Sequence, residues 1–259
     1  MVIKMANRPP FTALLQEKWA ENKFVCVGLD QSSYEANKKI IDATYDLVCA
    51  YKPNSAFYEA EGVEGLKALK KTVDHIRQKD LQIPIILDAK RGDIGNTNEG
   101  YAKAIFDDLG FDGVTVSPYL GEESLRPFLE RKDRGIIVLA KTSNPGAGEF
   151  QDLKVGGKPL YQIVAEHVAL WNKNGNCGVV VGATYPKELA TVRQIIGDNL
   201  PILIPGIGAQ GGDLETTVKA GQDSRGQGII INSSRGIIFA DDPREATLKL
   251  HQEIVSCLK

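Results

Sequence analysis

Short, nearly continuous apolar runs recur along the whole chain and alternate with longer stretches in which apolar residues return every three or four positions. Runs of Val, Ile, Leu and Ala are typical of strands buried on both faces of a parallel sheet. The eight expected strands cover residues 24–30, 47–53, 84–90, 113–117, 135–141, 178–182, 201–205 and 228–232.

Between these strands, apolar residues spaced three or four positions apart predict helices. The expected helices cover residues 11–22, 59–79, 186–196 and 241–258. Residues 59–79 carry an apolar stripe that consists of Val63, Leu66, Leu69, Val73 and Ile76.

Eight strand–helix units in 259 residues predict a (β/α)8 TIM barrel, with an extra N-terminal helix, as a single domain over residues 1–259. A doubly wound open sheet is the alternative, although such sheets usually have fewer strands. Residues 142–158 are the one long irregular segment that we expect. A loop of this length often serves as a lid or a binding loop.

The overall charge excludes a general attraction to polyanions. The formal net charge is −2, and 42% of the residues are hydrophobic and 25% are charged. The chain therefore lacks the basic field that draws nucleic acid or anionic lipid, and local groups must bind any anionic ligand. No apolar run approaches the ~18 residues of a membrane span, and residues 1–10 lack the apolar core of a secretory signal. We expect a cytoplasmic protein without nucleic-acid or membrane partners.

The cysteines are expected to be core residues, and the histidines are expected to be surface or helix-packing residues. The cysteines are widely spaced and form no CxxC pair, which favours reduced thiols in a cytosolic protein. All three histidines fall in helical segments, away from the strand ends. No strand end combines His or Cys at metal-ligand spacing, so we expect neither a metal nor an organic cofactor.

The expected strand 84–90 ends in a dense group of charges, in the run Asp88-Ala89-Lys90-Arg91-Gly92-Asp93. Alternate residues of a strand point to the same face, so Asp88 and Lys90 are expected side by side. An acid beside a base at the end of a core strand suits proton transfer or charge stabilisation. A local ion pair that only closes the strand end is the alternative.

Polar residues also end the other strands, and in a barrel these ends meet at the rim where active sites lie. Asp30, Lys52 and Ser143 follow or end the first, second and fifth expected strands. The ends of the seventh and eighth strands are the usual phosphate position of this fold. Residues 205–213 are rich in glycine, which lets backbone N–H groups approach an anion, and Arg235 adds a fork of donors. Two glycine-rich turns with a surface arginine are the alternative.

These observations predict a phosphorylated small-molecule substrate and a network of lysines and aspartates. A lysine held between carboxylates stays protonated, so it can stabilise a developing carbanion and deliver a proton to it. A carboxylate fixed beside it would disfavour a substrate carboxylate and promote its loss as CO2.

The run from Asp88 to Thr97 resembles the signature of the orotidine 5′-phosphate decarboxylase family. Residues 205–213 are similar to that family's loop after the seventh strand, and residues 143–147 are similar to its pyrimidine-contacting loop. The matches run in order from Asp30 to Arg235 and so cover nearly the whole chain.

The resemblance implies conversion of orotidine 5′-phosphate to UMP and CO2 in de novo pyrimidine biosynthesis, without a cofactor. It places Lys52, Asp88, Lys90 and Asp93 in the catalytic network. In that network Asp88 faces the substrate carboxylate and Lys90 protonates C6 of the pyrimidine. The substrate-binding residues that the resemblance implies are Asp30, Ile94, Thr97, Ser143, Pro205, Gly208, Gln210, Ser234 and Arg235. It also implies a homodimer with shared active sites, in which Asp93, Ile94 and Thr97 serve the partner's site.

Two other functions fit part of the pattern. A decarboxylase or aldolase acting on sugar phosphates shares Asp-x-Lys-x-x-Asp but uses Mg²⁺ held by added carboxylates. The strand ends lack an obvious second and third metal carboxylate beyond Asp30 and Asp88. A non-catalytic nucleotide-binding barrel that senses UMP would bind UMP without turnover.

Overall fold

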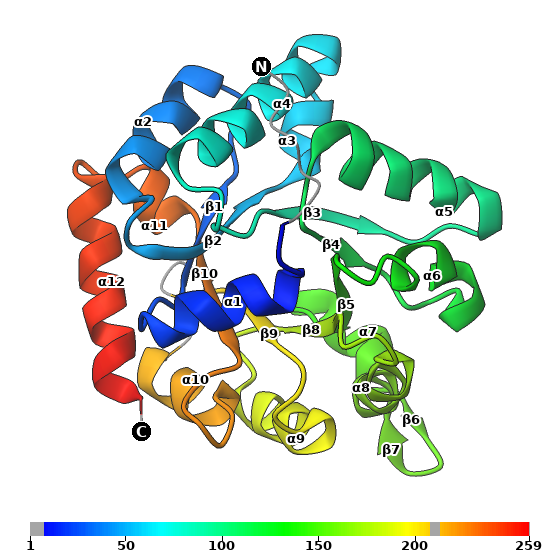
Figure 1. Ribbon diagram of the computed structural model, residues 1–259. Helices are drawn as coiled ribbons and strands as arrows, with labels where there is room; N and C mark the ends of the chain where they lie inside the picture. The colour runs from blue at the N-terminus through cyan, green and yellow to red at the C-terminus, as the bar shows by residue number, and fades with distance from the viewer. Residues whose placement is uncertain (1–7, 208–212, 259) are drawn as a thin grey trace.

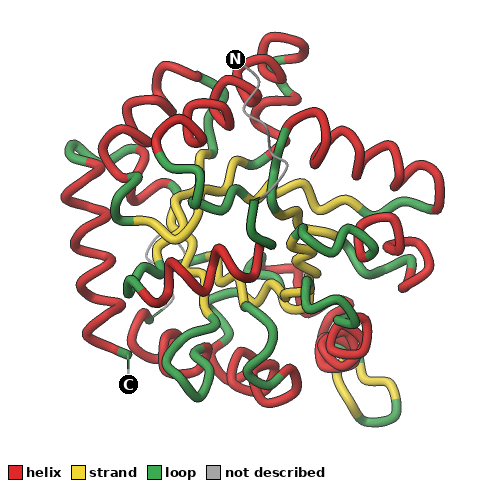
Figure 2. The backbone as a smooth tube through the Cα atoms, in the orientation of Figure 1, coloured by secondary structure: helices red, strands yellow, loops and turns green. Residues whose placement is uncertain are grey.

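The computed structural model describes residues 8–207 and 213–258, which form a ring of parallel strands inside a ring of helices (Figures 1 and 2). The barrel strands are β1 (Val25–Leu29), β2 (Val48–Pro53), β3 (Ile86–Arg91), β4 (Gly113–Val116), β5 (Gly135–Lys141), β8 (Cys177–Val181), β9 (Ile202–Pro205) and β10 (Ile229–Ser233). They pair in the order β2-β1-β10-β9-β8-β5-β4-β3. Parallel bridges from Tyr51 to Ile85 and from Asn54 to Asp88 join β2 to β3 and close the ring.

The predicted barrel is confirmed, and each barrel strand begins and ends within two residues of its expected run. The strand residues are almost all buried. One face of each strand fills the barrel interior and the other packs under the helices, which explains why the runs are apolar throughout.

The helices are α1 (Phe11–Ala20), α2 (Tyr34–Thr44), α3 (Ser55–Glu59), α4 (Gly62–Lys79), α5 (Gly95–Ala102), α6 (Gly121–Leu129), α8 (Leu160–Trp171), α9 (Pro186–Ile196), α10 (Leu214–Gly221), α11 (Arg235–Ile238) and α12 (Pro243–Cys257). A π-helical segment, Lys103–Leu109, continues α5. The helix predicted over residues 186–196 is confirmed at both ends. Those predicted over 11–22 and 241–258 are confirmed with slightly shorter bounds.

The helix predicted over residues 59–79 is confirmed with a later start, since α4 runs from Gly62 to Lys79 and the short helix α3 precedes it. The Asn54 side chain accepts a hydrogen bond from the Ala56 N–H at 3.1 Å, which starts α3 as a separate helix. A Cβ on Gly65 would lie 1.9 Å from the carbonyl oxygen of Tyr58, so the two helices touch backbone to backbone. The predicted apolar stripe is buried at Leu69, Val73 and Ile76 and exposed at Val63 and Leu66.

The segment 142–158 is more regular than expected. It contains a 3₁₀ turn (Pro145–Ala147), the short helix α7 (Gly148–Gln151), β6 (Lys154–Val155) and the start of β7 (Lys158–Pro159). Strands β6 and β7 form a hairpin whose two turn residues, Gly156 and Gly157, both have positive φ. That backbone suits a tight hairpin turn and is open to glycine without strain.

Helix α1 closes the N-terminal end of the barrel, and Figure 1 shows it lying across this end. The Phe11 ring packs on Gly113 and Gly135, the first residues of β4 and β5, so closely that a Cβ on Gly135 would lie 2.2 Å from it. The indole N–H of Trp19 donates to the carbonyl of Ile229 at the start of β10. The opposite end of the barrel is therefore the one available for a binding site.

Three of the cysteines, Cys26, Cys49 and Cys177, are free and buried, as expected of core thiols. Within the described part of the chain, no helix combines the length and the apolarity needed to cross a membrane.

Because α1 closes the barrel, we expect truncation of one buried leucine in this helix to lower the free energy of unfolding strongly. Leu15 in α1 is fully buried, whereas Leu170 in α8 is 69% exposed. We expect Leu15→Ala to lower the free energy of unfolding by about 2–5 kcal/mol, because it leaves a cavity under the barrel. Leu170→Ala makes the same change in a helix and should alter stability by no more than about 0.5 kcal/mol. Urea denaturation measures both, and equal effects would contradict the role given to α1.

Candidate active site

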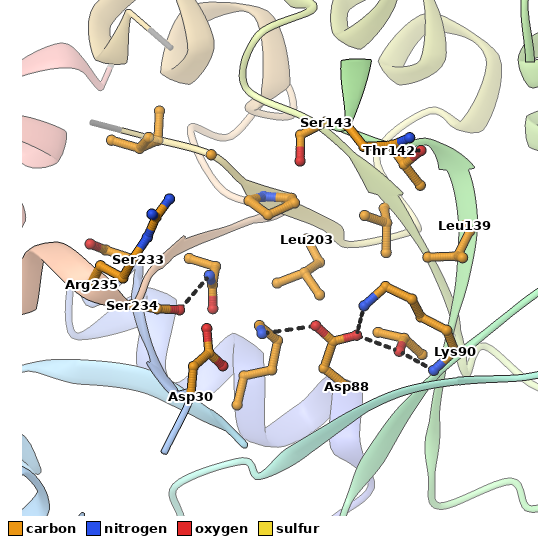
Figure 3. A pocket seen from close by; sticks show the side chains of 18 of the residues that line it. Asp30, Asp88, Lys90, Leu139, Thr142, Ser143, Leu203, Ser233, Ser234 and Arg235 are labelled. Atoms are coloured by element: carbon orange, nitrogen blue, oxygen red, sulfur yellow. Dashed lines mark hydrogen bonds and ion pairs between the residues drawn. The ribbon is translucent and has the colours of Figure 1, made fainter. Parts of the chain in front are cut away.

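A cavity of about 530 Å³ opens at the C-terminal ends of the strands, opposite α1. Its size suits a small organic molecule. Eight of the predicted site residues line it, namely Asp30, Lys52, Asp88, Lys90, Ser143, Pro205, Ser234 and Arg235. Figure 3 shows Ser234 and Arg235 across the cavity from Lys90, with Ser143 along one edge.

A series of three charges, Lys52–Asp88–Lys90, lies on one side of the cavity. Lys52 Nζ is 3.0 Å from Asp88 Oδ2, and Lys90 Nζ is 2.7 Å from Asp88 Oδ1. The Lys52 side chain is buried and that of Lys90 is half exposed. One carboxylate thus holds a fixed buried cation on one oxygen and a cation that reaches the cavity on the other.

The charges of this series stabilise one another. Burial by itself lowers the pKa of Lys52, but attraction first to Asp88 and then to Asp30 outweighs it and leaves that pKa raised. Burial by itself raises the pKa of Asp88, but attraction to Lys52 and Lys90 and their hydrogen bonds leaves it well below the ordinary value. Both groups therefore stay charged at neutral pH.

The contact between Asp88 and Lys90 is as expected, but ordinary strand alternation does not produce it. Lys90 has φ +48°, in the left-handed region that non-glycine residues rarely adopt. The pairing of β3 with β4 is interrupted between Leu87 and Arg91. The Thr115 hydroxyl of β4 forms hydrogen bonds with residues 88–90 in this interrupted part of β3. Sequence reasoning missed it, because a threonine between valines looks like any strand residue.

Two buried acceptors in the cavity wall have no hydrogen-bond partner within residues 8–207 and 213–258. They are Oδ1 of Asp30, after β1, and Oδ1 of Asn232, in β10. A buried acceptor without a partner is costly, so these atoms are suited to hydroxyl or amine donors of a ligand. Asn232 was missed as a site residue, although it stands beside Ser233 and Ser234 at a strand end.

Ser143 lies in a loop that is held by polar contacts of the two residues before it, Lys141 and Thr142. Lys141 at the end of β5 is completely buried, and its Nζ lies 2.6 Å from Asp152 Oδ1. The Gln151 side chain makes two hydrogen bonds of 2.9 Å to Thr142, one to the backbone N–H and one to the hydroxyl. A Cβ on Gly182 would lie 2.8 Å from the Cα of Ser143, so only glycine lets the loop sit this close.

The side of the cavity opposite Lys90 carries the positive charge of Arg235. Arg235 is exposed, and no other side chain in the described ranges forms an ion pair or hydrogen bond with its guanidinium. Ser234 lies next to it, and a Cβ on Gly28 would lie 1.9 Å from the Ser234 hydroxyl, so a glycine there makes room for that serine. Of the predicted residues, Gly208 and Gln210 lie outside the described part of the chain.

Asp93, Ile94 and Thr97 do not line the cavity of their own chain. Ile94 is 60% exposed and Thr97 is exposed. Asn98 holds the Asp93 backbone, since its side chain donates to the Asp93 carbonyl and accepts from the Asp93 N–H. These three residues therefore lie on an outer surface just beyond β3.

Across the described residues, no three His, Cys, Asp or Glu side chains are grouped so that they could hold a metal ion.

The lowered pKa of Asp88 predicts how this carboxyl group titrates. Its contribution to stability is fully present above the unfolded-state value of about 3.9 and is lost as the pH falls through the lower native pKa. We expect the Asp88 carboxyl ¹³C signal, assigned with Asp88→Asn, to keep its ionised shift at about pH 4, where exposed aspartates are half protonated. A midpoint at or above that of exposed aspartates would contradict the charge series.

Comparison with known proteins places the chain in a family. The model of the family described as Orotidine 5′-phosphate decarboxylase / HUMPS matches residues 23–250. An orotidine 5′-phosphate decarboxylase of Cupriavidus necator is 48% identical over 251 residues, which cover 91% of each chain. One of Thermomicrobium roseum is 50% identical over 249 residues, which cover 89% of this chain and 87% of the relative.

The structural comparison agrees. The solved structure of Leishmania donovani OMP decarboxylase matches with a TM-score of 0.90 and 42% identity, over 96% of this chain and 98% of that one. The chain belongs to the orotidine 5′-phosphate decarboxylase / HUMPS family.

Proposed function

We propose that this protein converts orotidine 5′-phosphate to UMP and CO2, and that it needs no metal or organic cofactor to do so. The observation that carries the proposal is a single cavity with the series Lys52–Asp88–Lys90 on one side and, on the other, Arg235, whose guanidinium has no side-chain partner among the described residues. Orotidine 5′-phosphate has a carboxylate on the ring at one end and a phosphate at the other. Relatives named for this reaction, nearly half identical over most of the chain, support the same assignment.

The proposed binding mode uses both ends of the cavity. Arg235 and Ser234 bind the phosphate, helped by Gly208 and Gln210, because a guanidinium fork matches phosphate oxygens. Asp30 accepts hydrogen bonds from the ribose hydroxyls through its unpartnered oxygen. Ser143 and Pro205 contact the pyrimidine ring. Phosphate binding far from the reacting carbon supplies energy to position the ring.

In the proposed chemistry, Asp88 faces the C6 carboxylate and Lys90 faces C6. The bond from C6 to the carboxylate breaks, CO2 leaves, and the electron pair stays on C6. Lys90 then gives a proton from Nζ to C6 and forms UMP, and solvent reprotonates the amine. The negative charge thus moves away from Asp88 and towards a cation that is already in place, which lowers the energy of the transition state relative to bound substrate.

We also propose a homodimer with shared active sites, formed by residues 1–259 as one cytoplasmic decarboxylase domain. Asp93, Ile94 and Thr97 would reach the partner's cavity, where Asp93 would extend the series to Lys–Asp–Lys–Asp. Two observations support this. These residues do not line their own cavity, and a half-exposed Lys90 has room for a second carboxylate.

The function is tested by following the loss of orotidine 5′-phosphate absorbance with purified protein, with and without EDTA. We expect turnover that survives EDTA. Lys90→Ala should lower kcat by at least about a hundredfold while UMP still binds, because the lost group acts on C6. Lys173→Ala, which removes an exposed lysine paired with Glu122, serves as the control and should leave turnover unchanged.

Each contrary outcome points to a different alternative. UMP binding without any turnover would indicate a nucleotide sensor, and loss of activity in EDTA would indicate a metal-dependent sugar-phosphate enzyme. Normal turnover by Lys90→Ala would exclude Lys90 as the proton donor.

Shared active sites predict complementation between two inactive variants. Mixed dimers of Asp93→Asn and Lys90→Ala contain one site with both substitutions and one with neither, so activity should recover to about a quarter of wild type if subunits exchange at random. The measurement is activity after mixing, with subunit exchange followed by a fluorescent label. Exchange without recovery would show that each site is built from one chain.

A further inference from the structure

Thr115 lies at the point where the strand that carries Asp88 and Lys90 departs from regular pairing. Four residue steps along β3, from Leu87 to Arg91, are matched by only two steps along β4, from Val114 to Val116. The extra residues form a bulge, with Lys90 in the left-handed conformation at φ +48°. Bulges are common beside active sites, where they redirect a side chain.

The bulge removes ladder hydrogen bonds, and the hydroxyl of Thr115 replaces them. Its oxygen accepts the backbone N–H of Ala89 at 3.1 Å and that of Lys90 at 3.0 Å. Its O–H donates to Asp88 Oδ1 at 2.9 Å. Without these bonds, two N–H groups inside the barrel would have lost their strand partners, which costs free energy.

We propose that Thr115 is a positioning residue for the decarboxylation, because its hydroxyl joins the left-handed backbone of Lys90 to the carboxylate of Asp88. This inference rests on the proposed function. Asp88 Oδ1 accepts from both the Thr115 hydroxyl and Lys90 Nζ, so the hydroxyl and the ammonium group share one oxygen. The direction of the carboxylate and the reach of the lysine are thereby fixed by the same contact.

The hydroxyl does not act on the substrate. A threonine hydroxyl has one donor and two acceptor positions, and Asp88, Ala89 and Lys90 use all three. Thr115 is also 99% buried, with only 1% of its surface exposed at the base of the cavity. Its effect must therefore pass through the two charged residues that it holds.

The test compares Thr115→Val, which keeps the shape and removes the hydroxyl, with Thr115→Ser, which keeps the hydroxyl. We expect the valine variant to lose about a hundredfold in kcat, since misplacing a reacting group by about an ångström has an effect of that size. Its affinity for UMP, which lacks the C6 carboxylate, should change by less than about threefold, because Arg235 and Asp30 are untouched. The serine variant should recover most of the wild-type kcat.

A matched control separates positioning from a general loss of stability. Thr247→Val in α12 removes an equally buried hydroxyl that does not line the cavity, so it should leave kcat unchanged. If Thr115→Val fails to fold, Thr115→Ala takes its place, with an expected loss of at least about tenfold in kcat and the same unchanged UMP affinity. A crystal structure of the folded variant should show Lys90 outside the left-handed region.

Three results would overturn the inference. They are an unchanged kcat in both the valine and the alanine variants, a loss in the serine variant as large as that in the valine variant, and a loss of UMP affinity that parallels the loss of kcat. Wild-type protein is assayed beside the variants. If it does not decarboxylate the substrate at all, the proposed function is wrong, and that outcome is distinct from a failure of the Thr115 inference.

Discussion

The burial of a charged lysine at the end of β2 is the constraint that organises this end of the barrel. Lys52 has almost no contact with solvent, so its charge requires carboxylates close by. Asp88 provides one at 3.0 Å and Asp30 adds further attraction. The ends of β1, β2 and β3 must therefore meet, although β2 and β3 are joined only by isolated bridges. The ion pair and the closure of the ring depend on each other.

The same pair suits the proposed reaction, in which negative charge moves from a carboxylate to a ring carbon. Lys52 is fixed, and its partner Asp88 is held by Lys90 and by Thr115 on its other oxygen. Lys90 is the one member with half of its side chain exposed, so it can reach a ligand and exchange protons with solvent. On the opposite side of the cavity, Arg235 is placed to bind an anionic group of a ligand. Fixed dipoles and charges of this kind need no rearrangement when the reaction occurs.

The sequence was sufficient for the strands, because a parallel barrel buries both faces and leaves continuous apolar runs such as that of β5. It was insufficient where one tertiary contact decides the outcome. The break between α3 and α4 falls at Gly62, which has positive φ, beside the backbone contact at Gly65. The charged residues at strand ends were visible because charge is out of place there. Thr115 was missed, because a single hydroxyl between two valines carries no such signal, and Asn232 was missed although Ser233 and Ser234 follow it at a strand end.

The packing of α1 against the barrel has a consequence for how such a protein can change. Phe11 and Trp19 contact the first residues of the strands, while the charged residues stand at the last ones. Layers of buried valine and isoleucine separate the two ends. Packing that closes the barrel and the candidate active site thus lie at opposite ends of the same strands. Substitutions around α1 can therefore change the stability of the barrel without touching the side chains that line the cavity.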